Sequence, residues 1–153
     1  MAEVATSRRA LMQQLAALRD SLREHGIRDA SDYAEVLIAE ALTGQRIASR
    51  VNKGHDVLAK LYGRVEVKCR QLPLDGRIEE RVEVAASKED GFEFLAVVIF
   101  HADFRVKGAI VAPYLAVWEF VGRQDYNRIS YPQACRLPGA VDITTAVQAA
   151  AER

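Results

Sequence analysis

Leucines recur at helical spacing near the start of the chain: Leu11, Leu15, Leu18 and Leu22. An apolar residue at every third or fourth position forms one face of a helix, and Gly26 follows as a stop signal. The pattern predicts an amphipathic helix within residues 1–29. We expect its leucine face to pack on the body of the domain, with a dimer seam as the alternative.

The next segments predict a helix and then a pair of strands. The stretch SDYAEVLIAEALTG reads as a helix that begins at Ser31 or Asp32 and ends at Gly44. After a basic connection, HDVLAK and RVEVKCRQL are short, rich in β-branched residues and separated by LYG, which predicts two strands joined by a tight turn. In the second strand two sets of side chains alternate between opposite faces of the sheet: Val65, Val67 and Cys69 against Glu66, Lys68 and Arg70.

The rest of the chain continues with strands and two short helices. FEFLAVVIFHADF is almost continuously apolar, as expected for a central strand covered on both faces, and RVKGAIVAP resembles its neighbour. PYLAVWEFVG and AVDITTAVQAAAER predict helices, and the loop between them leaves room for one edge strand. IEERVEVAASKEDG fits either a helix or a strand.

This order of elements predicts an α/β fold with a central mixed β-sheet flanked by helices. A length of 153 residues suits one domain. We divide it into an N-terminal helix (1–29), a core (30–122) and a C-terminal loop and helix (123–153).

Composition and charge narrow the class of protein. Half of the residues are hydrophobic and 27% are charged, as in ordinary globular domains. The formal net charge is zero, although residues 46–81 hold nine Lys or Arg against five Asp or Glu. Two cysteines are too few for a disulfide framework. Because no apolar run has the length of a membrane span or the form of a signal peptide, we expect a cytoplasmic protein without a membrane partner.

Three charged residues on the predicted strand pair suggest chemistry. Asp56 begins the first strand, while Glu66 and Lys68 share one face of the second. Two carboxylates can supply hard oxygen ligands to Mg²⁺ or Mn²⁺, and an ammonium beside them can orient an attacking water or stabilise phosphate charge. This is the chemistry of phosphodiester hydrolysis. The alternative is the solvated face of an ordinary antiparallel pair.

The spacing of Asp56, Glu66-Val67-Lys68 resembles the PD-(D/E)xK nuclease superfamily, which has the restriction-endonuclease-like fold. Glu35, in YAEVLIAEAL, matches the glutamate that many members carry on the preceding helix. The resemblance covers roughly residues 32–113 and implies a magnesium- or manganese-dependent nuclease related to prokaryotic restriction, defence or repair. It implies Asp56 and Glu66 as metal ligands, Lys68 and Glu35 as further catalytic residues, and DNA in preference to RNA as the substrate.

Some features depart from the family pattern or leave alternatives open. His55 replaces the proline that usually precedes the aspartate, and Ala34 stands where many members have glycine. Glu35 also fits a capping box with Asp32. We expect so short a chain to select its substrate through a homodimer, a partner subunit or a loop. The alternative function is a catalytically inactive domain of the same fold that serves as an interaction or nucleic-acid-binding module in a larger assembly.

Overall fold

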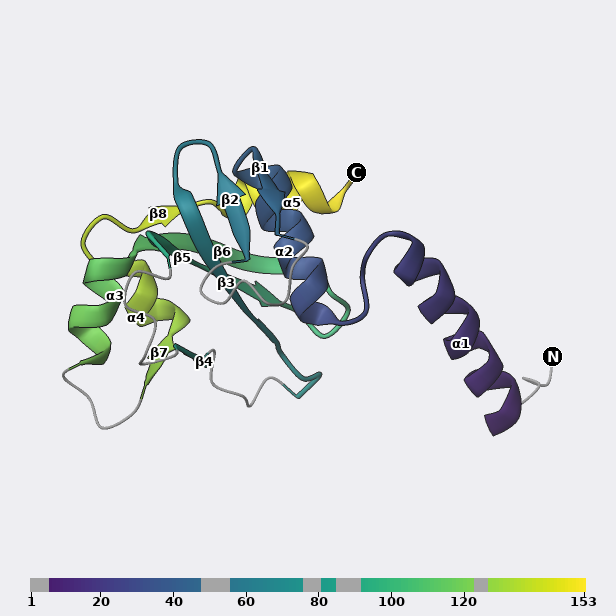
Figure 1. Cartoon of the computed structure of the whole chain (residues 1–153). Helices are drawn as coiled ribbons and strands as arrows, with labels where there is room; N and C mark the ends of the chain where they lie inside the picture. Colours follow the sequence, from purple (N-terminus) through teal and green to yellow (C-terminus); the bar gives the residue numbers. More distant parts are fainter. Residues whose placement is uncertain (1–5, 48–55, 76–80, 85–91, 123–126) are drawn as a thin grey trace.

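A mixed sheet of six strands forms the centre of the computed structural model, which describes residues 6–47, 56–75, 81–84, 92–122 and 127–153 (Figure 1). In spatial order the strands are β1 (Gly44–Arg46), β2 (Val57–Ala59), β3 (Gly63–Gln71), β5 (Phe94–Phe100), β6 (Val106–Pro113) and β8 (Val141–Asp142). Only the β3–β5 pair is parallel among these described strands. The predicted α/β fold with a mixed sheet and flanking helices is confirmed.

Helices cover both faces of the sheet. One face packs against α2 (Ala30–Ala41) and α5 (Thr144–Ala151). The other packs against α3 (Tyr114–Val121) and α4 (Tyr131–Cys135), together with a small sheet of β4 (Arg81–Glu83) and β7 (Arg128–Ser130). The predicted central strand, β5, is buried from Leu95 to Phe100 because it contributes side chains to both cores.

The predicted hairpin is formed by β2 and β3, with Val57 opposite Val65 and Ala59 opposite Gly63. Gly63 has φ +69° in this turn, a backbone conformation that favours glycine. In the described part of the chain β2 pairs with β3 only as far as Val65, whereas β3 continues to Gln71 beside β5. Among the described residues, no strand pairs with β3 beyond Val65 on the side of β2.

The boundaries of α2 differ from the prediction. Its N-cap is Asp29, whose side chain accepts a hydrogen bond from the backbone N–H of Asp32 at 2.9 Å. The helix thus begins before Ser31. After α2 the chain forms β1 rather than a simple basic connection. Gly44 permits this pairing, because a Cβ there would lie 2.6 Å from the carbonyl oxygen of Leu58.

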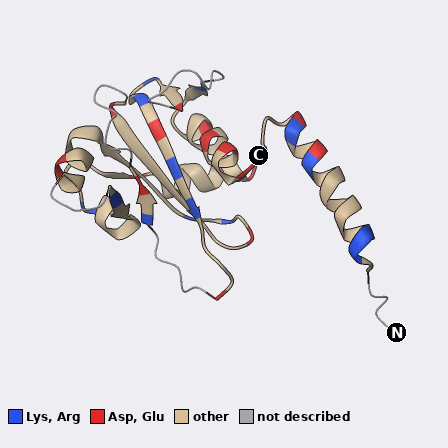
Figure 2. Cartoon of the chain, turned by 60° about the horizontal axis from the view of Figure 1, so that its bottom comes forward, with Lys and Arg blue, Asp and Glu red and all other residues tan. Residues whose placement is uncertain are grey.

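The first helix, α1 (Arg8–Glu24), stands apart from the body (Figures 1 and 2). Ser7 caps its start, and Gly26 follows its end with φ +73°. None of its residues is buried, and its four leucines are 38–61% exposed. The prediction that the leucine face packs on the body is wrong, because the chain after the helix leads α1 away from it.

Two segments that the sequence left open or only outlined each contain a short strand. The ambiguous stretch after residue 77 contains the strand β4, while residues 77–80 and 85–91 lie outside the described ranges. The predicted edge strand of the C-terminal loop is β7, which pairs with β4 and leads directly into α4. No helix in the described ranges is long and apolar enough to cross a membrane.

Candidate active site

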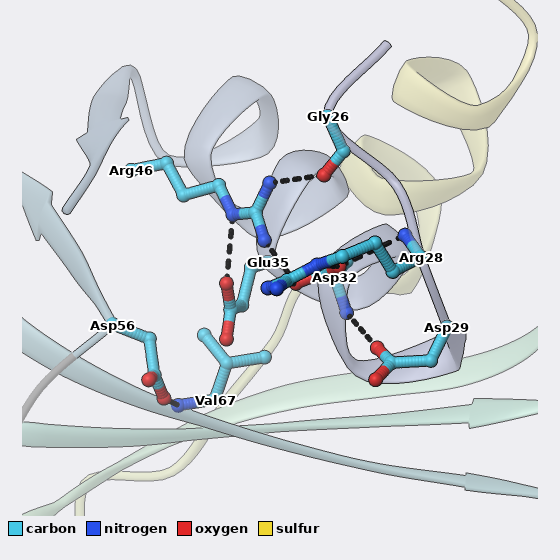
Figure 3. Close-up of polar contacts among 8 residues, drawn as sticks. All are labelled: Gly26, Arg28, Asp29, Asp32, Glu35, Arg46, Asp56 and Val67. Atoms are coloured by element: carbon cyan, nitrogen blue, oxygen red, sulfur yellow. Dashed lines mark hydrogen bonds and ion pairs between the residues drawn. The ribbon is translucent and has the colours of Figure 1, made fainter. Parts of the chain in front are cut away.

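Asp56 lies directly before β2, one position beyond the Val57–Val65 pair. Its backbone N–H donates to the carbonyl of Val65 at 2.9 Å, and its Oδ2 accepts from the backbone N–H of Val67 at 2.8 Å (Figure 3). The carboxylate is thereby fixed at the edge of β3, where the two strands separate.

Glu66 and Lys68 project from β3 as the alternation predicted. Their register partners on β5 are Leu95 and Val97, which belong to the core under α3, whereas Val67 faces the core under α2. Glu66 is only 4% exposed, and its Oε1 lies 3.4 Å from Nζ of Lys68. Lys68 keeps 34% of its side chain exposed, so this ion pair extends from the core toward solvent.

Glu35 is held by an arginine from the neighbouring strand. Nε of Arg46, on β1, donates to Oε2 of Glu35 at 2.7 Å. The same guanidinium forms an ion pair with Asp32 and donates through Nη1 to the carbonyl of Gly26 at 2.8 Å (Figure 3). Arg46 therefore joins the carboxylate of Glu35 to the start of α2 and to the segment that follows α1.

The electrostatic surroundings of Glu35 include Asp56. Burial raises the pKa of the Glu35 carboxyl, the hydrogen bond from Arg46 lowers it in part, and the charge of Asp56 raises it again; the net shift is upward. The two carboxylates lie near each other in Figure 3, Glu35 from α2 and Asp56 from the β3 edge. The structure thus brings together these two predicted residues.

Asp32 plays a structural part in this corner. Nε of Arg28 donates to Oδ2 of Asp32 at 2.9 Å, and the backbone N–H of Arg28 donates to the same oxygen at 2.9 Å. Burial opposes ionisation of Asp32, but the hydrogen bonds from Arg28 and the charge of Arg46 outweigh it and lower its pKa. The capping box of Asp32 with Glu35 is wrong, because Asp29 is the cap and Arg46 binds Glu35.

The four predicted site residues fall into two pairs. Glu35 neighbours Asp56, and Glu66 neighbours Lys68. Helix α2, which carries Glu35, covers the face of the sheet opposite to Glu66 and Lys68. Asp56 lies at the strand edge between these two faces. Sequence reasoning missed Arg46, for which the local surplus of basic residues was the only signal.

The side chains near this site limit which kind of metal centre the chain can form. Among the residues with described positions, no three His, Cys, Asp or Glu side chains form a group that could hold a metal. Mg²⁺ commonly uses one or two carboxylates and leaves its other positions to water and substrate phosphate. The described carboxylates therefore do not form a closed structural metal centre, and a magnesium ion here would depend on one or two of them.

Ala34 and His55 are the two residues that depart from the family pattern. Ala34 is completely buried in the core between α2 and the sheet, where its methyl group fills space. His55 lies outside the described residues.

No protein-family model matches the chain, and no curated protein matches it significantly.

Proposed function

We propose that this chain is a metal-dependent nuclease domain with restriction-endonuclease-like architecture, which hydrolyses phosphodiester bonds in nucleic acid, DNA in preference to RNA. The order of elements supports the proposal. A helix carrying Glu35 precedes an antiparallel hairpin with Asp56 and Glu66, and a strand parallel to β3 follows, within a sheet covered by helices on both faces.

The observation that carries the proposal is the burial of Glu66 beside Lys68. Burying a carboxylate costs free energy unless it is paired or hydrogen-bonded. Glu66 is 4% exposed, is paired with an ammonium that reaches solvent, and occupies the strand position next to the Asp56 edge. A buried carboxylate at this position, beside an ammonium that reaches solvent, supports a role in the site.

The residues divide the chemistry among them. Asp56 and Glu66 would hold Mg²⁺ or Mn²⁺, which supplies charge neutralisation and water activation when bound. The ammonium of Lys68 is available to orient the attacking water and to stabilise negative charge on the phosphate in the transition state. Glu35 is an outer group, which neighbours Asp56 and is held in place by Arg46.

Cleavage of plasmid, linear duplex, single-stranded DNA and RNA, with Mg²⁺ or Mn²⁺ against chelator, tests the proposal. We expect metal-dependent cleavage that falls at least ~100-fold in Lys68→Ala, the scale typical of losing one transition-state contact. Asp56→Asn should lose cleavage similarly, and its remaining side-chain oxygen can still accept from the Val67 N–H. Lys60→Ala is the matched control, because Lys60 is an exposed lysine in the hairpin turn.

The variants separate activity from contamination. Cleavage that is lost in Lys68→Ala and Asp56→Asn but kept in Lys60→Ala supports the assignment of the site. Cleavage that persists in all three variants comes from another enzyme and contradicts it. Absence of cleavage by the folded wild-type protein, on every substrate and with both metals, also contradicts the nuclease proposal.

A second candidate function is a noncatalytic nucleic-acid-binding or interaction module of the same fold. The ion pair between Glu35 and Arg46 favours it, because this arginine already neutralises a carboxylate that the first proposal places at the site. Such a module would bind DNA with an affinity that falls steeply with salt and would leave the DNA intact. Binding without cleavage, unchanged in Lys68→Ala, would therefore select this second function.

A further inference from the structure

The leucine face of α1 is complete and unusually accessible. Leu11, Leu15, Leu18 and Leu22 follow the 4-3-4 spacing of coiled-coil a and d positions, and all four are exposed. In proteins an amphipathic helix gains most of its stability by packing its apolar face. The described body of the same chain buries no residue of α1.

The connection after α1 keeps this face away from the body. The backbone N–H of Ile27 donates to the carbonyl of Leu22 at 3.0 Å and closes the end of the helix. Arg46 holds the carbonyl of Gly26, and Asp32 holds both the backbone and the side chain of Arg28. These hydrogen bonds hold the connecting segment in the arrangement in which the described body leaves the leucine face uncovered.

The residues that flank the leucines allow pairing with an identical helix. With Leu15 and Leu22 as a positions, the flanking e and g positions are Met12, Gln14, Arg19 and Ser21. Arg19 is the only charged residue among these four. Two copies of the seam can therefore meet without rows of like charge along its edges.

The charges along α1 favour one orientation of such a pair. The first turn holds Arg8 and Arg9 and no acidic residue, whereas the half of α1 nearer the body is neutral, because Asp20 and Glu24 balance Arg19 and Arg23 there (Figure 2). Parallel pairing would bring two basic ends together. Antiparallel pairing places each basic end beside the neutral half of the other helix, and it also opposes the two helix dipoles.

We propose that α1 forms an antiparallel helix pair with α1 of a second copy of this chain, with Leu11 of one helix facing Leu22 of the other and Leu15 facing Leu18. The two bodies then lie at opposite ends of a helix pair that is ~25 Å long, at 1.5 Å per residue. This interface is independent of the proposed nuclease chemistry.

Analytical ultracentrifugation of the full chain over a range of concentrations tests the interface. We expect a reversible species of twice the 17.0 kDa mass of the monomer. Leu15→Glu/Leu18→Glu should raise the dimer dissociation constant at least ~100-fold, because it buries charge in the seam. The control Gln13→Glu/Ala16→Glu adds the same charge on the opposite face of the helix and should change the constant little. Circular dichroism verifies that each variant folds.

Disulfide trapping tests the orientation, in a background where Cys69→Ala and Cys135→Ser remove the native thiols. After oxidation, a mixture of Leu11→Cys and Leu22→Cys proteins should give a cross-linked dimer, whereas neither protein should do so alone. Cross-linking of Leu11→Cys alone would overturn the antiparallel arrangement. A wild-type protein that stays monomeric, or a dimer that survives Leu15→Glu/Leu18→Glu, would overturn the interface itself.

Discussion

Replacement of Arg46 by methionine tests the network that joins the start of α2 to the candidate site. Methionine keeps much of the length of the side chain but removes the ion pairs with Glu35 and Asp32 and the hydrogen bond to Gly26. Asp32 retains Arg28, so Glu35 is the carboxylate that loses its cation. The substitution leaves a largely buried negative charge uncompensated.

The structure sets the size of the effect. Removing one partner of a fully buried ion pair costs roughly 3–5 kcal/mol. Because 26% of the Arg46 side chain is exposed and Asp32 keeps a partner, we expect a loss of about 2–3 kcal/mol in the free energy of unfolding. For a domain of this size that corresponds to a melting temperature lower by roughly 5–10 °C.

Urea unfolding followed by far-ultraviolet circular dichroism measures this loss, and the slope of the free energy against urea should not change. Arg128→Met is the matched control, because Arg128 pairs with Glu83 at 3.0 Å with both side chains more than half exposed. Such surface pairs contribute less than about 1 kcal/mol. If Arg46→Met costs no more than Arg128→Met, the network does not stabilise the fold. Adding Glu35→Gln should recover part of the loss, since it removes the uncompensated charge.

Three further predictions concern stability and use the same urea assay. The pKa of Asp32 in the folded state is lowered from 3.8, so the folded chain keeps this carboxylate ionised at lower pH than the unfolded chain does. The ionised carboxylate should therefore stabilise the fold above pH 3.8, and this stabilisation should disappear as the pH falls through the lowered pKa. Asp32→Asn should remove this pH dependence. Leu95→Ala should cost about 2–5 kcal/mol, since Leu95 is completely buried under α3. Gly63→Ala should cost about 1–2 kcal/mol because of its positive φ, with the nearby Glu93 carboxylate moving aside.

Local patterns predicted the sheet well. The alternation in β3 assigned Val65 and Val67 to one core and Glu66 and Lys68 to the other face, because side chains on a strand alternate regardless of what covers them. The continuous apolar run of β5 predicted a strand buried on both sides for a similar reason. These inferences depend only on neighbours along the chain.

Long-range partners could not be predicted from local patterns. Glu35 fitted a capping box by its spacing from Asp32, yet Arg46, distant in sequence, binds both carboxylates in the folded chain. The leucine periodicity of α1 correctly predicted an apolar helix face. The prediction that this face packs on the body was wrong, because none of its residues is buried. The segment that connects α1 to the body is held in part by a hydrogen bond from Arg46, which lies on β1 and is distant from Gly26 in sequence.

The hydrogen bond between Asp56 and the Val67 N–H also affects how the protein behaves in solution. On the β2 side of β3 the described strands leave the edge beyond Val65 unpaired, and an unpaired strand edge is a template for pairing with another polypeptide, which leads to aggregation. The Asp56 carboxylate takes the position that a carbonyl of an incoming strand would occupy, and its charge discourages a second backbone from approaching. Asp56→Ala would remove both obstacles. Light scattering should therefore show faster aggregation for Asp56→Ala than for Lys68→Ala, which leaves this edge closed.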